Sequence, residues 1–323
     1  MGMNIKTFSL YLLVCGIIFA IAPFFISSYY VYLIALGMVY GIWALSWNVL
    51  FNYTGLLSFG HALWFALGAY VVGLTQERLM IMSMECYLGL TLVVSFILSL
   101  AVGYLCVRYT QIYFALLTQG FSMLFYAMLV KFYSFTHGTD GISVKVPALL
   151  GMQFTNVESF LRAYYYYILL IFLLCATILW IMMNSPFGKS LQFLRDNSLR
   201  ARFIGIPVIK YRLWSFVIAG VFGAISGALF APLNRQVCPE LTYWSSNGNV
   251  VFMTLLGGFS VFAGSAIGAI IFVFLQNIAL TLTIYWQLIA GIVIVVIVYL
   301  FPKGLTVSIK DMVVGMYKKV HGR

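Results

Sequence analysis

Long apolar stretches run through the whole sequence, and they limit the chain to the folds that a lipid bilayer allows. A bilayer core about 30 Å thick requires about 20 apolar residues for each helical crossing. An α-helix suits this environment because it satisfies its backbone hydrogen bonds internally. We therefore predict an all-α fold, a polytopic transmembrane helical bundle with about ten crossings, one of them short or broken. The predicted crossings are Phe8–Ser27, Tyr30–Leu50, Leu56–Leu74, Tyr87–Val107, Ile112–Val130, Tyr164–Met183, Leu213–Leu233, Val250–Phe262, Gly264–Leu280 and Ile284–Leu300.

The composition excludes a water-soluble protein. Of the 323 residues, 63% are hydrophobic and 8% are charged, whereas a soluble domain carries about 25% charged residues. The net charge of +11 is explained by membrane topology, because Lys and Arg concentrate in cytoplasmic loops. We therefore expect membrane lipid and no nucleic acid as a partner. No low-complexity linker divides the chain, so we expect a single membrane domain over residues 1–323.

Basic residues set the expected orientation in the membrane. The loop Asn184–Arg212 carries six Lys and Arg against one Asp, and the tail after Leu300 carries five against one. Both should be cytoplasmic, so an even number of crossings separates them. That requirement includes the short segment Val250–Phe262, which ends in a glycine pair. The N-terminus is then cytoplasmic too, and Lys131–Ala163 forms an external loop.

Several kinds of chemistry are missing from the predicted crossings. None of the seven acidic residues lies inside one, and buried carboxylates normally mark ion or proton pathways. This argues against an ion-coupled carrier and against a membrane enzyme that holds Mg²⁺. No GxxxxGK[ST] loop is present, so ATP would have to bind to another subunit. His61 lies in a crossing but has no Cys, His or acid at ligand spacing, and we expect no metal site, cofactor or catalytic residue.

An amphipathic segment follows the sixth predicted crossing. Ser185 and Pro186 are typical of the first positions of a helix. Phe187, Leu191 and Leu194 then recur with helical spacing and form one apolar face. Such a helix either lies on anionic lipid or docks on a cytoplasmic partner, and the pattern alone leaves both interpretations open.

Four blocks of sequence carry a resemblance to a known family. The blocks are NYTGLLSFGHALWFALGAY (Asn52–Tyr70), YFALLTQGFSMLFYA with THGTDGIS (Tyr113–Ser143), NSPFGKSLQFLRDN with FIGIP (Asn184–Pro207) and PELTYWSSNGNVVFMTLLGGFSVFAGSAIGA (Pro239–Ala269). In this order and at these separations they resemble LivM-type permeases, the membrane subunits of ABC importers for branched-chain amino acids. Urea and short-chain amide permeases are close relatives.

The resemblance implies a transport subunit and not an enzyme. It implies a permease that moves small neutral amino acids, of the branched-chain type, across the bacterial inner membrane by alternating access. The implied partners are a second homologous permease, two ATP-binding subunits and a periplasmic substrate-binding protein. Gln119 stands where amino acid permeases more often have an apolar residue, so a urea or short-chain amide permease is the alternative. An ATP-independent channel is a further alternative from another class.

Three groups of residues are candidates for these roles. Polar or aromatic side chains within apolar crossings are expected to line the substrate pathway, with packing against protein as the alternative for each: Ser58, His61, Trp64, Thr118, Gln119 and Ser122. The cytoplasmic loop 184–212 is expected to couple to the ATPase through Ser185, Pro186, Phe187, Gly188, Leu191, Arg195 and Gly205. The external loop and a nearby acid are expected to dock the binding protein through Gly138, Asp140, Gly141 and Glu158.

Overall fold

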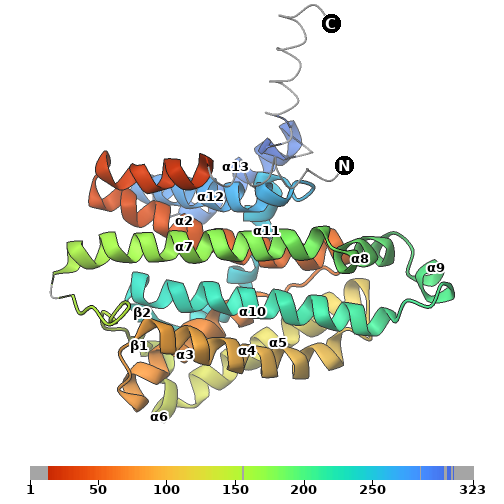
Figure 1. The fold of residues 1–323 in the computed structure, drawn as a ribbon, viewed down its shortest axis with the longest axis horizontal. Coiled ribbons are helices and arrows are strands. Elements are labelled where there is room, and N and C mark those ends of the chain that lie inside the picture. The colour runs from red at the N-terminus through yellow and green to blue at the C-terminus, as the bar shows by residue number, and fades with distance from the viewer. Residues whose placement is uncertain (1–13, 155, 284, 302–303, 307, 309–323) are drawn as a thin grey trace, which may run out of the picture.

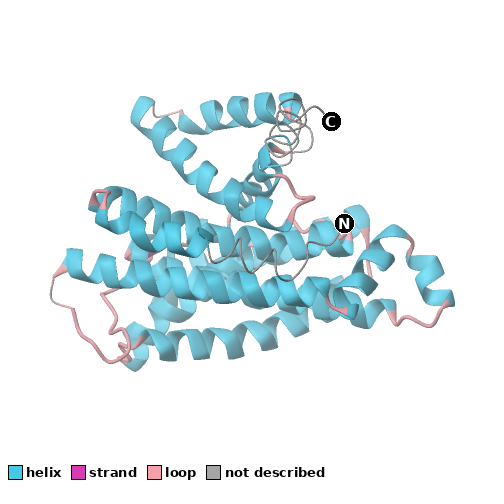
Figure 2. Cartoon of the chain, turned by 45° about the horizontal axis from the view of Figure 1, so that its top comes forward, coloured by secondary structure: helices cyan, strands magenta, loops and turns pink. Residues whose placement is uncertain are grey.

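The computed structural model describes residues 14–154, 156–283, 285–301, 304–306 and 308, and nearly all of this chain is helical (Figure 2). The long helices are α2 (Ser28–Asn48), α3 (Ala62–Leu79), α4 (Met84–Cys106), α5 (Gln111–Lys131), α7 (Val157–Asn184), α10 (Val208–Asn234), α11 (Trp244–Gly257), α12 (Phe262–Leu282) and α13 (Trp286–Leu300). The short elements are η1 (Ala22–Phe24), η2 (Val49–Thr54), α6 (Tyr133–Thr136), η3 (Gly138–Asp140), α8 (Pro186–Asp196), α9 (Ser198–Phe203), η4 (Pro239–Thr242), β1 (Ile142–Ser143) and β2 (Gln236–Val237).

Six of these helices are long and apolar enough to cross a membrane. They are α2 together with η2, α4, α5, α7, α10 and α12. Val14–Phe24 and Gln287–Ile297 are shorter apolar helices. The prediction of an all-α membrane bundle is therefore confirmed, whereas the number of about ten crossings stays a prediction. The predicted N-terminus and most of the basic tail lie outside the described residues.

Different short elements lie at the two ends of the bundle (Figure 1). α6, η3 and the β1–β2 pair lie at one end, on the left of Figure 1, and α8 and α9 lie at the other, on the right. The two strands are antiparallel, with Ile142 opposite Val237 and Ser143 opposite Gln236. We call these the α6 end and the α8 end. The loops that the charge pattern predicts on opposite sides of the membrane thus lie at opposite ends of the bundle.

The core is built around α2 and α10. In their most apolar stretches 83% and 89% of the residues are buried, against 22% in α4 and 28% in α5. Close approach of α3 and α10 depends on glycine, because a Cβ at Gly227 would lie 1.7 Å from the carbonyl oxygen of Phe65. A Cβ at Gly68 would lie 1.8 Å from that of Ala224. Small residues permit such backbone contact between membrane helices.

Two predicted crossings differ from the helices observed. The predicted crossing Leu56–Leu74 becomes helical only at Ala62, because Gly55 has a positive φ of +73° and ends the preceding helix. The short crossing Val250–Phe262 is α11, which begins earlier and ends at Gly257. With 14 residues it is about 21 Å long, shorter than a bilayer core.

Candidate functional site

A non-helical segment, Gly55–His61, enters the bundle between η2 and α3. Two tryptophans of α2 hold its backbone: Trp47 Nε1 donates to the carbonyl of Ser58 (2.8 Å) and Trp43 Nε1 to that of His61 (3.4 Å). Non-helical backbone is tolerated within a membrane protein where protein groups satisfy its hydrogen bonds. In this conformation the segment is therefore held against α2 by two tryptophan hydrogen bonds.

The start of α3 is joined to three other elements by a group of buried polar side chains. Ser46 Oγ lies 2.8 Å from His61 Nε2. The backbone N–H of Ala62 donates to Asn247 Oδ1 of α11 (2.7 Å), and Asn247 Nδ2 donates to Ser122 Oγ of α5 (3.2 Å). We call Ser46, His61, Asn247 and Ser122, together with Gln119 beside them, the central polar junction.

Three further features complete the junction. Ser122 Oγ donates to the carbonyl of Thr242 in η4 (2.8 Å), and Asn247 Nδ2 also donates to Gln119 Oε1 (3.4 Å). His61 Nδ1 and Gln119 Nε2 are buried without a partner in the described part of the chain. Two interrupted helices, α3 and α11, thus begin at this buried junction. Interrupted membrane helices are a common way to build a substrate site in transporters.

The residues predicted to line the pathway are brought close to this junction. Thr118 packs on Gly60, where a Cβ would lie 1.9 Å from the Thr118 carbonyl oxygen. Trp64 packs edge-on against Phe216 of α10, with ring centroids 5.7 Å apart. In this conformation all six are enclosed by protein to some extent: Gln119 is half-buried, and Ser58, His61, Trp64, Thr118 and Ser122 are buried. Their role as pathway lining stays a prediction.

Two members of the junction were not predicted from the sequence. Ser46 lies within an apolar crossing, so its polarity was the available signal. Asn247 precedes the predicted crossing Val250–Phe262, in the polar stretch WSSNGN, which is typical of a loop. The structure instead places it in the first turns of α11, fully inside the protein.

The apolar face of α8 is covered by the chain itself. Leu191 and Leu194 are buried, at 0% and 2% exposure, and the Phe187 ring stacks on Tyr211 of α10 with centroids 5.5 Å apart. Ser185 and Pro186 occupy the predicted first positions, but Ser185 Oγ donates to the Met182 carbonyl and does not cap the helix. The chain itself therefore covers the two leucines of this face, whereas Phe187 stays half-buried and the role of α8 in coupling stays a prediction.

The tight joint between α7 and α8 depends on Gly188. A Cβ there would lie 2.1 Å from the carbonyl oxygen of Met183. Arg195, near the other end of α8, donates from Nη1 to the Asn52 carbonyl of η2 and from Nη2 to Asp196 Oδ1 (3.0 Å). α8 is thus attached along its length to the membrane helices.

α9 projects from the α8 end of the bundle (Figure 1). Asn197 Oδ1 caps it by accepting from the N–H of Arg200 (2.9 Å), and Gly205, with a φ of +87°, follows its end. Three large apolar side chains on or beside it are exposed, among Arg200 and Arg202: Leu199 at 60%, Phe203 at 81% and Ile204 at 67%. These three residues were not predicted from the sequence, although Leu199 and Phe203 directly flank the two arginines.

At the α6 end, Gly138 and Gly141 adopt positive φ of +52° and +73° around η3 and form a tight turn. Tyr133 donates to Asp140 Oδ2 (2.9 Å), and this hydrogen bond, with the charge of the carboxylate, raises the pKa of the Tyr133 phenol above its usual value. His137 Nε2 lies 2.8 Å from Glu77 Oε1 and ties the turn to the end of α3.

Glu158 is separate from this turn within the described contacts. It lies in the first turn of α7, where it accepts from Ser28 Oγ at 3.5 Å. Over the described residues, His, Cys, Asp and Glu do not gather in groups of three that could hold a metal ion.

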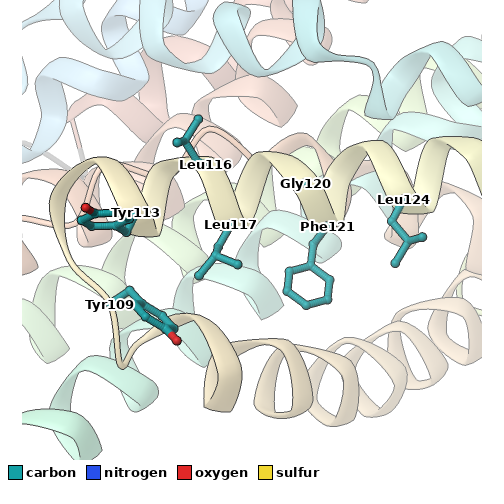
Figure 3. Close-up of a pocket in the computed structure, with 7 residues that line it drawn as sticks. All are labelled: Tyr109, Tyr113, Leu116, Leu117, Gly120, Phe121 and Leu124. Atoms are coloured by element: carbon teal, nitrogen blue, oxygen red, sulfur yellow. The ribbon is translucent and has the colours of Figure 1, made fainter.

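An apolar groove lies along the outer face of α5. Its volume is about 660 Å³, and Figure 3 shows Leu117, Phe121 and Leu124 on one side of the helix and Tyr109 on the connection that precedes it. The lining residues are Tyr109, Tyr113, Leu116, Leu117, Gly120, Phe121 and Leu124. Gly120 has open space in front of it. The side of α5 that carries Ser122 and Thr118 faces the protein, so α5 separates the central polar junction from this groove.

Comparison with known proteins relates this architecture to a transport family. A family model for the permease component of branched-chain amino acid transport systems matches residues 29–298. The high-affinity branched-chain amino acid transport permease LivM of Salmonella typhimurium is 26% identical over 94% of this chain and 76% of its own length. A probable LivM of Methanocaldococcus jannaschii is 24% identical over 87% and 94%.

A more partial similarity links the chain to another transport permease. The autoinducer 2 import permease LsrC of Yersinia pseudotuberculosis is 30% identical over 38% of this chain and 37% of its own length. No solved structure matches the chain significantly. Since the family model covers most of the sequence, the chain belongs to the family of permease components of branched-chain amino acid transport systems.

Proposed function

We propose that this chain is the permease subunit of an ATP-driven importer that moves small neutral amino acids, of the branched-chain type, across the bacterial inner membrane. The family match over residues 29–298 is the observation that carries the proposal. The chain works with a second homologous permease, two ATP-binding subunits and a periplasmic substrate-binding protein. It forms one permease domain of about ten crossings, with both termini in the cytoplasm.

The central polar junction is proposed as the part of this subunit that opens and closes toward substrate. Asn247 Oδ1 occupies the first backbone donor of α3, and the polar groups around it are enclosed by protein. A zwitterionic or amide substrate needs such hydrogen-bonding groups, and helix N-termini favour its negative end. Separation of α11 from α3 would expose them, and return of Asn247 would close the path.

Partner contacts are proposed at three places. The exposed apolar side chains of α9 enter a cleft of the ATP-binding subunit, because a few large apolar anchors within a basic rim suit such an interface. The turn with Gly138, Asp140 and Gly141, together with Glu158, receives the binding protein at the α6 end. The α5 groove faces the second permease, so that the pathway runs between the two subunits.

A urea or short-chain amide permease is the second candidate within this class. The observation that favours it is the pair of amide side chains, Gln119 and Asn247, that meet at the junction. Gln119 Nε2 is buried without a partner among the described residues, and such a donor suits the carbonyl oxygen of urea or of an amide.

Reconstitution of the complete importer in proteoliposomes tests the proposal. The assay compares uptake of [³H]leucine, [¹⁴C]urea and [¹⁴C]acetamide in the presence of the binding protein, with and without ATP on the side of the ATP-binding subunits. ATP-dependent leucine uptake is expected. Uptake of urea or acetamide alone would replace the amino acid assignment by the amide one. Movement of any of these solutes without ATP-binding subunits would contradict an ATP-driven permease and favour a channel.

A further inference from the structure

The last turns of α2 form an unusual element. Val49–Thr54, here η2, is π-helical, and Gly55 follows it in the left-handed region. The N–H of Leu56 then donates to the Leu50 carbonyl (2.9 Å), six residues back. π-Helical turns are rare and are found often at functional sites.

Arg195 of α8 makes side-chain hydrogen bonds to this element. Its Nη1 donates both to the backbone carbonyl of Asn52 and to Asn52 Oδ1 (3.3 Å). Asp196 Oδ1 accepts from Arg195 Nε (3.1 Å) and Nη2 (3.0 Å), which fixes the plane of the guanidinium group. Because the guanidinium group is planar and its donors have fixed directions, this arrangement orients α8 relative to the Asn52 carbonyl.

Gly55 lets the arginine approach. A Cβ at this position would lie 2.8 Å from Arg195 Cγ, and the φ of +73° disfavours any other residue. Gly55 thus contributes to the contact between α8 and η2 in two ways, because it has no side chain and because it adopts a positive φ. The exposed Arg195–Asp196 ion pair is therefore joined to a close backbone contact between α8 and η2.

The joint leads without interruption to the central polar junction. Five residues lie between Gly55 and His61, and Trp47 and Trp43 donate to the backbone carbonyls of Ser58 and His61. Ala62, the next residue, donates to Asn247. Gly55–His61 therefore connects η2 directly to the first hydrogen bond of α3. Along this segment the backbone is hydrogen-bonded to α2 at two points.

η2 also contacts the second interrupted helix. The Phe51 ring stacks on Trp47, with centroids 4.8 Å apart, and meets Phe259 edge-on at 5.2 Å. Phe259 follows Gly257 and Gly258, where α11 ends. The same π-helical turn thus contacts the α8 end of α11 and the segment that leads into α3.

We propose that η2 is a hinge that carries movement of α8 to the central polar junction, and that Arg195 is the residue that positions it, through the Asn52 carbonyl. This inference rests on the proposed function, since it assumes that the ATP-binding subunits move α8. Conversion of η2 between π- and α-helix would shift Gly55–His61 by one residue of helical rise and rotation. The Ala62–Asn247 hydrogen bond would then break or form with each cycle.

Arg195→Ala in the complete importer tests the hinge. The readout is the ratio of [³H]leucine transported to ATP hydrolysed in proteoliposomes, with assembly checked by co-purification. We expect hydrolysis stimulated by the binding protein to persist while the ratio falls about tenfold or more, within the range of about 5- to 150-fold typical of coupling between sites. Arg195→Lys keeps one donor to the Asn52 carbonyl and should recover part of the ratio.

Gly55→Ala and Lys189→Ala complete the design. Gly55→Ala displaces Arg195, so it should lower the ratio in the wild-type background and add little in the Arg195→Ala background. Lys189 is exposed on the same helix, and its removal should leave the ratio unchanged.

Each result decides between the two levels of the argument. If the wild type shows no ATP-dependent uptake, the proposed function fails and the hinge fails with it. If the wild type couples and Arg195→Ala couples equally well, the hinge alone is overturned. Parallel loss of hydrolysis and uptake, additive effects of the two substitutions, or loss of assembly in both variants would reduce the joint to a structural contact and also overturn it.

Discussion

Asn247 is buried in the middle of the bundle, where water cannot replace a lost hydrogen bond. Its amide accepts from Ala62 and donates to Ser122 and Gln119, so one side chain joins α11 to α3 and α5. Removal of one partner from buried hydrogen bonds leaves the others unsatisfied, and each unsatisfied group costs about 1–3 kcal/mol.

Asn247→Ala is therefore expected to lower the free energy of unfolding by about 2 kcal/mol and to abolish uptake. Asn277→Ala is the matched control, because its Oδ1 accepts from the hydroxyl of Tyr29 in an exposed pair. That change should cost less than about 0.5 kcal/mol. Thermal unfolding in detergent and leucine uptake measure the two effects. Equal stability and uptake in both variants would show that the junction contributes neither to folding nor to transport.

Polarity within apolar crossings was enough to find part of this site. Ser58, His61 and Ser122 stand out in the sequence because a polar group in a membrane needs a partner. The partners could not be read from the sequence, because they are backbone carbonyls or come from a stretch typical of a loop. Asn247 became visible only when the fold brought η4 and α11 into the bundle beside α5.

The backbones of α3 and α10 approach each other very closely. Gly227 has no room for a methyl group, since its Cβ would lie 1.7 Å from the Phe65 carbonyl oxygen. Gly227→Ala must separate the two backbones, and overpacking of this kind costs about 1–3 kcal/mol. We expect lower thermal stability in detergent and a lower yield of folded protein.

Gly291→Ala is the control for this packing prediction. Gly291 lies within α13 with open space around it, so alanine there should have no steric cost and should favour the helix slightly. If Gly227→Ala were as stable as Gly291→Ala, the predicted steric cost at the contact between α3 and α10 would be wrong.

α9 is the element on which the proposed ATPase contact depends. Phe203 is 81% exposed, so its truncation should not disturb folding. An anchor of this kind contributes about 2 kcal/mol or more to binding, and Phe203→Ala should weaken the complex with the ATP-binding subunit by about 30-fold. Phe25 is the control, because it is 83% exposed and precedes the first residue of α2. Phe25→Ala should leave the affinity unchanged. The affinity is measured with purified components; equal loss in both variants, or none, would exclude α9 as the anchor.

The sequence pattern of α8 shows what periodicity can and cannot predict. The spacing of Phe187, Leu191 and Leu194 correctly indicates an apolar face that is covered. It does not say by what, because lipid, a partner and the chain's own helices all cover such a face by the same hydrophobic effect. The structure places α7, α10 and η2 there, and leaves the less periodic α9 exposed.

At the scale of the whole molecule, hydrophobicity and charge predict the architecture well. Every predicted crossing with a described counterpart overlaps a helix, and the two long loops lie at opposite ends. The interruptions were harder to place, because Leu56, Leu57 and Phe59 extend the apolar stretch of the crossing to the residues before α3. Their break depends on the positive φ of Gly55 and on tryptophan contacts from α2, which are tertiary features.

Orientation in the membrane is the property of the whole chain that remains a prediction. Because Lys and Arg favour the cytoplasmic side, the α8 end should be cytoplasmic and the α6 end periplasmic. In a cysteine-free background, Thr139→Cys in η3 should react with a membrane-impermeant maleimide in cells whose outer membrane has been permeabilised. Ser198→Cys in α9 and Ser308→Cys should react only after the inner membrane is opened as well.

Reaction of Ser198→Cys with the inner membrane intact would show the opposite topology. α9 would then lie on the periplasmic side and could not contact the ATP-binding subunit. Reaction of Ser308→Cys alone would mean an odd number of crossings between α9 and the tail, and α11 would then not cross the membrane.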